Sequence, residues 1–410
     1  MRFWQRFWQA IGTRERLAVV VLGVVLGYLG SCIIRFLHHD WILNAAGAPQ
    51  LTDFVAVWSA GKLAHAGQAA SAYAPQLMHS AEAATLGHAA AGRFDWPYPP
   101  FYFFVVAPLA LLSYPQAFLA WAAAGVAGYG AAVSAAANSR TAALFALAAP
   151  WSLANLTIGQ NGFLTATLMG LFLLQLEARP AMAGLLLGLL ACKPQLGLLI
   201  PLALAAGGYW RGFAWACATV AGLTALSAAI FGPATLTGFA HALTTTGQTL
   251  LVSGMAGWYK LQSAYGVARW FGLPAAAGWL AQAVVTLCCV VAVARLWRGH
   301  SAFALKAAGL CVAALLATPY VFAYDLPMLG VAVAFLHRER PLDALEGAAL
   351  GFAVLGFAAT LLWPAPTPFL ATLTVAALVL RRMGQGDAVS CARSWRWQRY
   401  GPAWSRSSRR

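Results

Sequence analysis

Long apolar runs without a formal charge constrain this chain more than any other feature. Examples are residues 17–34, 141–176, 212–259 and 347–380. A helix needs about 20 apolar residues to cross the hydrocarbon core of a bilayer. The runs therefore predict transmembrane helices, and the longest runs must be divided by proline, glycine or polar clusters.

The composition supports the same conclusion. Charged residues make up only 9% of the 410 residues, whereas a soluble domain carries about a quarter. So few ionic groups cannot cover a water-facing surface, which excludes a soluble globular enzyme and a disordered chain. We expect an all-α polytopic membrane protein with a bundle of about 12 transmembrane helices. The expected spans are residues 17–36, 100–112, 118–136, 162–176, 181–192, 196–209, 213–231, 274–296, 303–317, 326–337, 345–363 and 367–380.

One apolar stretch, residues 141–156, does not fit this count. Counting it as a span breaks the alternation of inside and outside, and Arg140 lies on the outside by the count although arginine favours the inside. We therefore expect a non-spanning or re-entrant segment, broken near Pro150.

The formal net charge is +15, and much of the excess lies near the two ends. Lys and Arg gather on the cytoplasmic side of membrane proteins. We therefore expect both termini inside and two larger loops, residues 38–99 and 232–270, outside. Residues 1–380 would form a single transmembrane domain, and residues 381–410 a basic cytoplasmic tail whose arginines and tryptophans suit anionic membrane lipids. No nucleic-acid partner is expected.

The seven cysteines show no CxxC pattern and no Cys/His spacing typical of a metal site, so no metal is expected. No internal repeat is visible either. This weighs against a transporter built from inverted halves.

Asp53 follows the first expected span, in the sequence Leu51-Thr52-Asp53-Phe54. A carboxylate at the outer membrane edge can accept a proton from a hydroxyl nucleophile. Aspartate is also a favoured helix N-cap, which is the structural alternative.

Two further polar clusters interrupt the apolar sequence. Tyr98 lies in a proline-rich turn that can be a plain interfacial turn, since Tyr favours the membrane interface. Gln160 and Asn161 stand between glycines and separate two apolar runs. Side-chain amides offer a donor and an acceptor to sugar hydroxyls, or they can cap helix ends inside the membrane.

Lys193 is the sharpest feature, because it stands alone between two apolar runs and is followed by Pro194 and Gln195. An unpaired ammonium at that depth costs roughly 2.5 kcal/mol or more. Binding of a phosphate head group would explain a lysine at this position. The alternative is that the side chain extends from a helix end to the membrane surface by snorkelling. Tyr324-Asp325 places a second carboxylate at an outer edge, where it can also cap the helix that follows.

The order and spacing of these motifs are together more informative than any one of them. The motifs are Asp53-Phe54, Tyr73-Ala74-Pro75, Tyr98-Pro99-Pro100, Gly159-Gln160-Asn161, Lys193-Pro194, Phe231-Gly232, Thr318-Pro319-Tyr320 and Tyr324-Asp325. In this arrangement the sequence resembles glycosyltransferase family 87, the polyprenol-phosphate-mannose-dependent mannosyltransferases of the GT-C superfamily. The resemblance covers nearly the whole chain, from about Asp53 to Asp325.

The resemblance implies a GT-C-like bundle that transfers a hexose with inversion on the extracytoplasmic face of the cell inner (plasma) membrane. The donor would be a polyprenyl-phosphate sugar, most simply mannose, and the acceptor an envelope lipid or glycan; no bound cofactor is implied. Asp53 would be the general base and Lys193 would bind the donor phosphate. The substrate-binding residues would be Tyr98, Gln160, Asn161, Gln195, Tyr324 and Asp325.

Two other classes of function compete with this interpretation. A transporter or flippase of lipid-linked sugars would explain the spans, Lys193 and the amides, but it does not call for a long first loop with a carboxylate at the membrane edge. An O-acyltransferase of the cell envelope typically relies on a histidine, and no histidine lies in polar company within an expected span.

Overall fold

The structure is a computed structural model that describes residues 13–88, 94–361 and 363–399. Its regular elements in these ranges are helices, with only isolated β-bridges between loop residues. The α-helices are α2 (Thr13–Leu37), α3 (Phe54–His65), α4 (Pro75–Leu86), α5 (Phe103–Leu109), α6 (Tyr114–Ala137), α7 (Arg140–Ala148), α8 (Pro150–Ile158), α9 (Gly162–Gln175), α10 (Pro180–Leu190), α11 (Ile200–Gly207), α12 (Trp210–Phe231), α13 (Ala234–Gly247), α14 (Ala264–Trp270), α15 (Ala275–Arg298), α16 (Phe303–Leu316), α17 (Pro327–Glu339), α18 (Ala344–Ala358) and α19 (Pro368–Arg399).

Four of the described helices are long and apolar enough to cross a bilayer, namely α2 from Leu17 onward, α6, α12 and α15. Shorter apolar helices, among them α9, α10 and α16, pack against these longer ones. The chain is therefore a polytopic helical membrane protein, as the sequence predicts.

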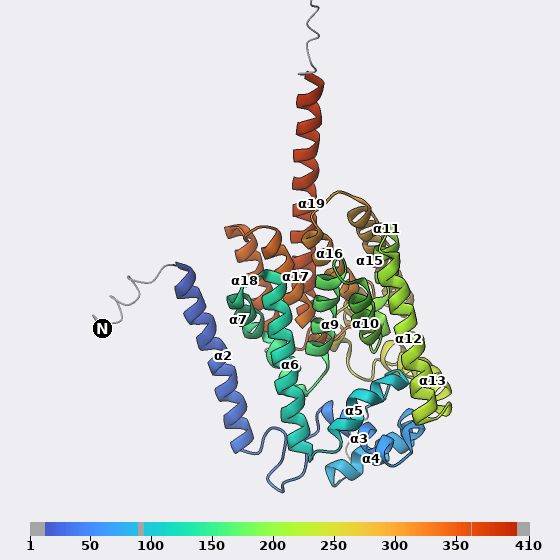
Figure 1. Ribbon diagram of the computed structural model, residues 1–410. Coiled ribbons are helices and arrows are strands. Elements are labelled where there is room, and N and C mark those ends of the chain that lie inside the picture. The colour runs from blue at the N-terminus through green and yellow to red at the C-terminus, as the bar shows by residue number, and fades with distance from the viewer. Residues whose placement is uncertain (1–12, 89–93, 362, 400–410) are drawn as a thin grey trace, which may run out of the picture.

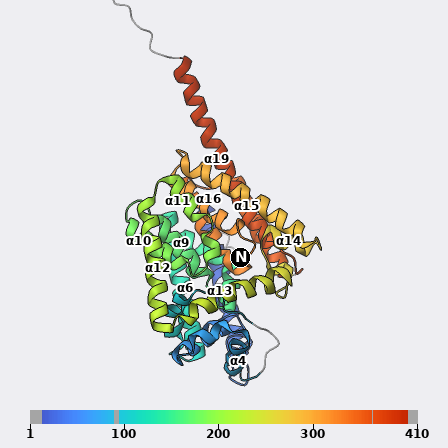
Figure 2. The same ribbon diagram turned by 90° about the vertical axis from the view of Figure 1, so that its right-hand side faces the viewer.

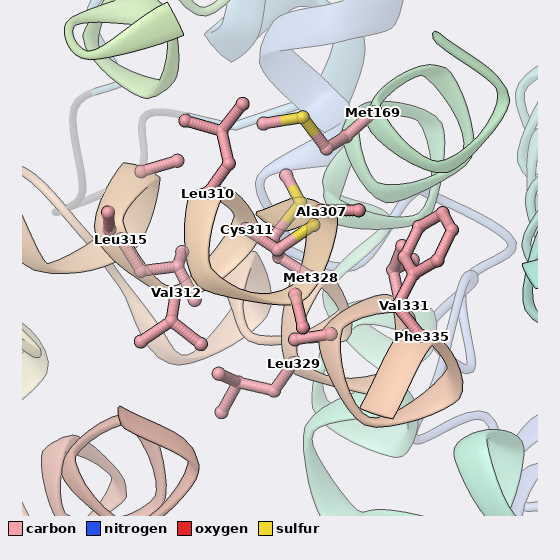
Figure 3. Packing of buried hydrophobic residues seen from close by; sticks show 14 of the residues in the cluster. Met169, Ala307, Leu310, Cys311, Val312, Leu315, Met328, Leu329, Val331 and Phe335 are labelled. Atoms are coloured by element: carbon pink, nitrogen blue, oxygen red, sulfur yellow. The ribbon is translucent and has the colours of Figure 1, made fainter. Parts of the chain in front are cut away.

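Helix α16 occupies the interior of the bundle. Every residue from Ala307 to Leu316 is buried, as expected for a helix that is apolar on all sides. Figure 3 shows its side chains packed with Met328 and Val331 of α17 and with Met169 of α9. This packing fixes the start of α17, which begins two residues after one of the expected site residues, Asp325.

The bundle has two different ends (Figures 1 and 2). Helices α3, α4 and α5 gather at one end, and the far part of α19 projects from the other. Helix α2 runs along the margin and contacts α7. The end with α3 and α4 contains most of segment 38–99, the first of the two segments that the sequence places outside the membrane.

The predicted interruption at Pro150 is confirmed. Helices α7 and α8 meet there at a bend of 70°, so the apolar stretch is divided into two short helices. Proline favours the first position of a new helix, and its ring cannot continue the preceding one.

Several predicted boundaries differ from the structure. The expected span 196–209 is a short 3-10 helix η3 (Pro194–Gly197) followed by α11, and the expected span 100–112 is a 3-10 turn η2 (Pro100–Tyr102) followed by α5, which ends at Leu109. Proline near the start of each piece removes a backbone donor and limits helix length. Segment 232–270, expected as a loop, is largely helical, with α13, a π-helical turn η4 (Gln248–Val252) and α14.

The structure also differs from the sequence prediction at residue 381, where the basic tail was expected to begin. Helix α19 continues without a break past residue 380 to Arg399, and Arg382 is buried within the bundle. Residues 400–410 of the expected tail lie outside the described residues.

Candidate active site

Asp53 lies immediately before the first residue of α3, in the N-cap position. Its side chain nevertheless makes no capping hydrogen bond. Instead, Nε2 of Gln160 donates to Oδ2 of Asp53 at 2.7 Å, across 107 residues of sequence. The capping alternative for this carboxylate is therefore wrong, and its Oδ1 accepts no hydrogen bond from the described part of the chain.

Two glycines explain why Gln160 can reach Asp53. Gly159 has φ +74°, and a Cβ there would lie 2.7 Å from Cβ of Phe54. A Cβ on Gly162 would overlap the backbone carbonyl of Tyr324. Glycine is the residue that tolerates both a positive φ and such close approach. The short turn between α8 and α9 is thus wedged between the start of α3 and the segment before α17.

The amides of this turn form a connected set of hydrogen bonds. Oε1 of Gln160 accepts from the Tyr98 hydroxyl at 3.4 Å and from the backbone N–H of Asn161 at 3.2 Å. Nδ2 of Asn161 donates to the Tyr102 hydroxyl at 3.3 Å. Oδ1 of Asn161 is buried and has no partner among the described residues. An orphaned buried acceptor is costly and calls for an explanation, and a hydroxyl-bearing ligand would supply one.

Aromatic rings line the same region. Tyr98 stacks on Tyr102 with ring centroids 4.6 Å apart, and Trp96 lies 4.8 Å from Tyr98. Trp96 and Tyr102 are fully buried and support the ring of Tyr98, which is partly exposed. An aromatic ring with a hydroxyl beside side-chain amides suits a sugar, which presents C–H faces and hydroxyls together.

Lys193 is not the lone cation that the sequence suggests. Its Nζ donates to Oδ1 of Asp325 at 2.6 Å, and both side chains are almost fully buried, with 5% and 2% of their surface exposed. The ammonium also lies over the Tyr324 ring, 4.9 Å from its centroid. The premise of an unpaired charge is therefore wrong, and so is the snorkelling alternative, because the head group does not reach the surface.

Asp325 is held from the other side by the chain itself. The backbone N–H of Phe322 donates to its Oδ2 at 3.0 Å, within the 3-10 turn η6 (Ala323–Asp325). The structure therefore brings Gln160 and Asn161 next to Tyr324, and Tyr324 next to the Lys193–Asp325 pair. Gln195 lies in η3 beside Lys193, and it makes no hydrogen bond to the other expected site residues in the described part of the chain.

Burial raises the pKa of the Asp53 carboxyl above its ordinary value. The hydrogen bond from Gln160 lowers this pKa, as do the positive charges of Lys260 and Lys193, but burial dominates. A raised carboxyl pKa makes the carboxylate a stronger base.

An apolar cavity of about 110 Å³ lies between α6 and α9 and reaches Gln160. Its wall includes Trp121, Gly125 and Gly128 of α6 and Phe163 of α9. The missing side chains of the two glycines leave space beside Phe163 and Thr167. The cavity thus joins an apolar wall to the polar turn that holds Asp53.

Tyr102, which accepts a hydrogen bond from Asn161, is a residue of this site that was not predicted from the sequence. Tyr102 follows the proline-rich turn containing Tyr98, and the spacing of four residues between the two tyrosines was the available signal. Among the described residues, no three His, Cys, Asp or Glu side chains are grouped so that they could hold a metal ion.

Comparison with known proteins gives one match. The family model described as glycosyltransferase family 87 matches residues 96–319, more than half of the chain. No curated protein and no solved structure matches the chain. The matched region includes the Gln160–Asn161 turn and Lys193, whereas Asp53 and Asp325 lie on either side of it.

Proposed function

This chain belongs to glycosyltransferase family 87 and is a membrane glycosyltransferase. On that premise we propose that it transfers a hexose, most simply mannose, from a polyprenyl phosphate to an envelope lipid or glycan. The transfer proceeds with inversion at the extracytoplasmic face of the inner membrane. The observation that carries this proposal is the Asp53 carboxylate, which occupies an N-cap position without capping and is held by Gln160 instead.

In the proposed reaction an acceptor hydroxyl attacks the anomeric carbon of the donor sugar. Asp53 takes the hydroxyl proton as the new C1–O bond forms, and the bond between C1 and the phosphate oxygen breaks. Oδ2 of Asp53 is engaged by Gln160, so Oδ1 receives the proton. The hydrogen bond from Gln160 fixes the carboxylate in one orientation, which lowers the entropic cost of reaching the transition state.

Lys193 is the proposed hydrogen-bond donor to the leaving phosphate. An ammonium has three N–H donors, and only one of them is engaged by Asp325. Tyr98, Gln160, Asn161 and Tyr324 line the proposed sugar and acceptor site, with Asp325 and Gln195 at its edge. Asn161 is well suited to bind a sugar hydroxyl, because its buried Oδ1 lacks a partner among the described residues.

The cavity beside Gln160 supports a lipid-linked substrate. Its wall is largely apolar and its polar end lies at the residue that holds the base. We propose that part of a lipid chain occupies this cavity while the head group reaches Asp53. Gly128→Leu would fill it, and it should raise KM for a long-chain donor much more than for a donor with a short prenyl chain.

The proposed topology has 12 spans, both termini inside and segments 38–99 and 232–270 outside. Ala84 and Thr244 are exposed residues of these two segments. Cysteines introduced at these positions should react with an impermeant maleimide on intact cells, above the background of the parent chain. Labelling only after permeabilisation would overturn the proposed orientation.

A reconstituted assay tests the chemistry. Purified protein in nanodiscs is supplied with labelled polyprenyl-phosphate mannose and a lipid extract, and transfer of the label to an acceptor supports the proposal. The alternative of a lipid-linked sugar transporter predicts movement of the labelled donor across vesicles without transfer. Polyprenyl-phosphate glucose, galactose and arabinose in the same assay identify the sugar.

A further inference from the structure

The buried Lys193–Asp325 pair leaves the phosphate end of the proposed site short of positive charge. Both partners are inside the protein and 2.6 Å apart, so their charges largely cancel. In the proposed reaction the donor phosphate diester carries one negative charge, and the released polyprenyl phosphate carries nearly two. A charge that grows during bond breaking is best stabilised by a cation that is not already neutralised.

Lys260 is such a cation. It ends the short 3-10 helix η5 (Trp258–Lys260), and its side chain is exposed. In the described part of the chain no carboxylate lies within ion-pair distance of its Nζ, which lies 5.9 Å from the Tyr259 ring centroid. Lys260 is therefore available to a ligand in a way that Lys193 is not.

The backbone of Lys260 is held firmly although its side chain is free. Nε2 of the buried Gln262 donates to the carbonyls of Tyr259 at 2.9 Å and of Lys260 at 3.1 Å. Oε1 of the same amide accepts from the backbone N–H of Phe369 at 3.0 Å. A buried glutamine whose donor and acceptor are both engaged fixes the turn that carries the lysine.

The same turn is joined to the segment that ends at Asp325. The backbone N–H of Gln262 donates to the carbonyl of Val321 at 2.7 Å, and Leu261 forms an isolated antiparallel bridge with Phe322. Phe322 in turn donates to Asp325. The turn that carries Lys260 is thus joined through the backbone to the segment that ends at Asp325. The positive charge of Lys260 also acts to lower the pKa of Asp53.

We propose that Lys260 binds the phosphate of the donor and stabilises the second negative charge that develops on it as the C1–O bond breaks. The inference rests on the proposed function. The proton of the acceptor hydroxyl goes to Asp53, the electron pair of the breaking bond goes to the phosphate oxygen, and no further reactant is needed. Lys193, whose side chain is held in place by Asp325, then donates a hydrogen bond to the phosphate, whereas Lys260 supplies the net positive charge.

The test compares Lys260→Gln with Lys62→Gln. Lys62 is a matched control, because it is also exposed and lies over an aromatic ring, Trp58, at 4.7 Å. Lys260→Gln should lower kcat/KM for the polyprenyl-phosphate sugar roughly tenfold to a hundredfold, as expected for a hydrogen bond to a charged group. Lys260→Arg should recover much of this loss, and Lys62→Gln should show none.

Two further measurements separate a charge effect from a structural one. Inhibition by polyprenyl phosphate should weaken in Lys260→Gln, whereas inhibition by the uncharged polyprenol should not change. The acidic limb of the pH profile should move to higher pH in Lys260→Gln, because Asp53 loses a cation that lowers its pKa.

The outcomes are distinguishable. Lack of transfer by the wild-type protein with any polyprenyl-phosphate sugar would refute the proposed function itself. Transfer by the wild type, together with equal kcat/KM and equal phosphate inhibition in Lys260→Gln and Lys62→Gln, would overturn the role of Lys260 alone. An equal loss in Lys260→Arg and Lys260→Gln, with unchanged melting curves, would also overturn it, since charge would then not matter.

Discussion

Two buried charged clusters lie near the two ends of α17, which is about 20 Å long, and they are built differently. At the α19 end, Arg382 donates to both carboxylate oxygens of Glu346, at 2.9 Å and 2.7 Å, and to Glu339 at 2.8 Å. Glu346 also forms a reciprocal cap with Asp343, with bonds of 3.1 Å and 2.9 Å. The charged groups here satisfy one another, and the cluster joins α17, α18 and α19.

The Asp53 end holds polar groups that the protein does not satisfy. Nζ of Lys193 has a single carboxylate oxygen as its partner, and Asp53 is held through one oxygen only. Oδ1 of Asn161 and Nε1 of Trp96 are buried without partners in the described ranges. A saturated cluster stabilises a fold, whereas an unsaturated one leaves donors and acceptors for a ligand. The difference is the reason for placing the proposed substrate site at the Asp53 end of the bundle.

The largest expected effect is at Asp53. Asp53→Asn should lower transfer about a hundred- to ten-thousand-fold, because an amide cannot take the acceptor proton. The melting temperature should barely change, since the side chain makes no capping bond and Asn is an equally good cap residue. The measurement is sugar transfer in nanodiscs alongside a melting curve.

Asp40→Asn is the control for this variant, because Asp40 is exposed in the same segment. Its activity should equal that of the wild type. Retention of more than about a tenth of wild-type transfer in Asp53→Asn would lie outside the general-base range and would move the search for a base to Asp95 or Asp325.

The Lys193–Asp325 pair can be dissected by a double-mutant cycle. Lys193→Met and Asp325→Asn should each destabilise the protein by about 3–5 kcal/mol, because each leaves a buried charge without its partner. The double variant should regain most of this stability. If Lys193 also donates to the donor phosphate, the double variant should remain inactive although it is stable. Full recovery of transfer would show that the pair is structural only.

Arg382→Met probes the saturated cluster. It should cost about 1.5–3 kcal/mol, as expected for lost hydrogen bonds to a charged group, because Arg340 and Arg381 remain within 3.1 Å of the Glu346 carboxylate. The melting temperature should fall accordingly. The kcat of the molecules that remain folded should equal that of the wild type at low temperature. A loss of kcat without a loss of stability would contradict the distinction between the two ends.

Glu82 gives the smallest effect, and it depends on pH. Burial raises the pKa of this side chain from 4.5 to about 7, and its Oε1 has no partner among the described residues. The folded protein therefore holds a proton that the unfolded chain releases above pH 4.5. This stabilisation, up to about 3 kcal/mol, is complete below pH 4.5 and is lost as the pH rises through 7.

Glu82→Gln should remove that pH dependence and should stabilise the protein at pH 8. Melting curves at pH 5.5 and pH 8 measure the effect, with His88→Gln as a control for another titratable residue nearby in the sequence. An unchanged difference between the two pH values in Glu82→Gln would contradict the assignment.

Much of the framework could be predicted from the sequence because it depends on local properties. Apolar runs and the scarcity of charge predict a helical membrane protein, and Pro150 marks the bend between α7 and α8. Asp53 and the Gln160–Asn161 turn stand out because polar residues are rare in such a chain. Their direct contact could not be deduced from spacing, since it depends on Gly159 packing against Phe54.

The partner of Lys193 could not be predicted for a related reason. Asp325 lies 132 residues away, and the sequence around each residue contains no sign of the other. The continuation of α19 past residue 380 also depends on a contact between distant residues. Arg381 and Arg382 read as the start of a basic tail, but Arg382 is buried by a contact with Glu346, a residue on a different helix.

The Lys193–Asp325 contact also has a consequence for biosynthesis. A ribosome adds about 5–20 residues per second, so it needs roughly 7 to 26 s to make the 132 residues that separate the partners. During this interval the first half of the bundle contains an ammonium whose permanent partner does not yet exist. We therefore expect the segment between α10 and η3, which carries Lys193, to stay near water or lipid phosphates until the start of α17 has been made. A chain released before Asp325 therefore differs from the finished protein by one uncompensated charge.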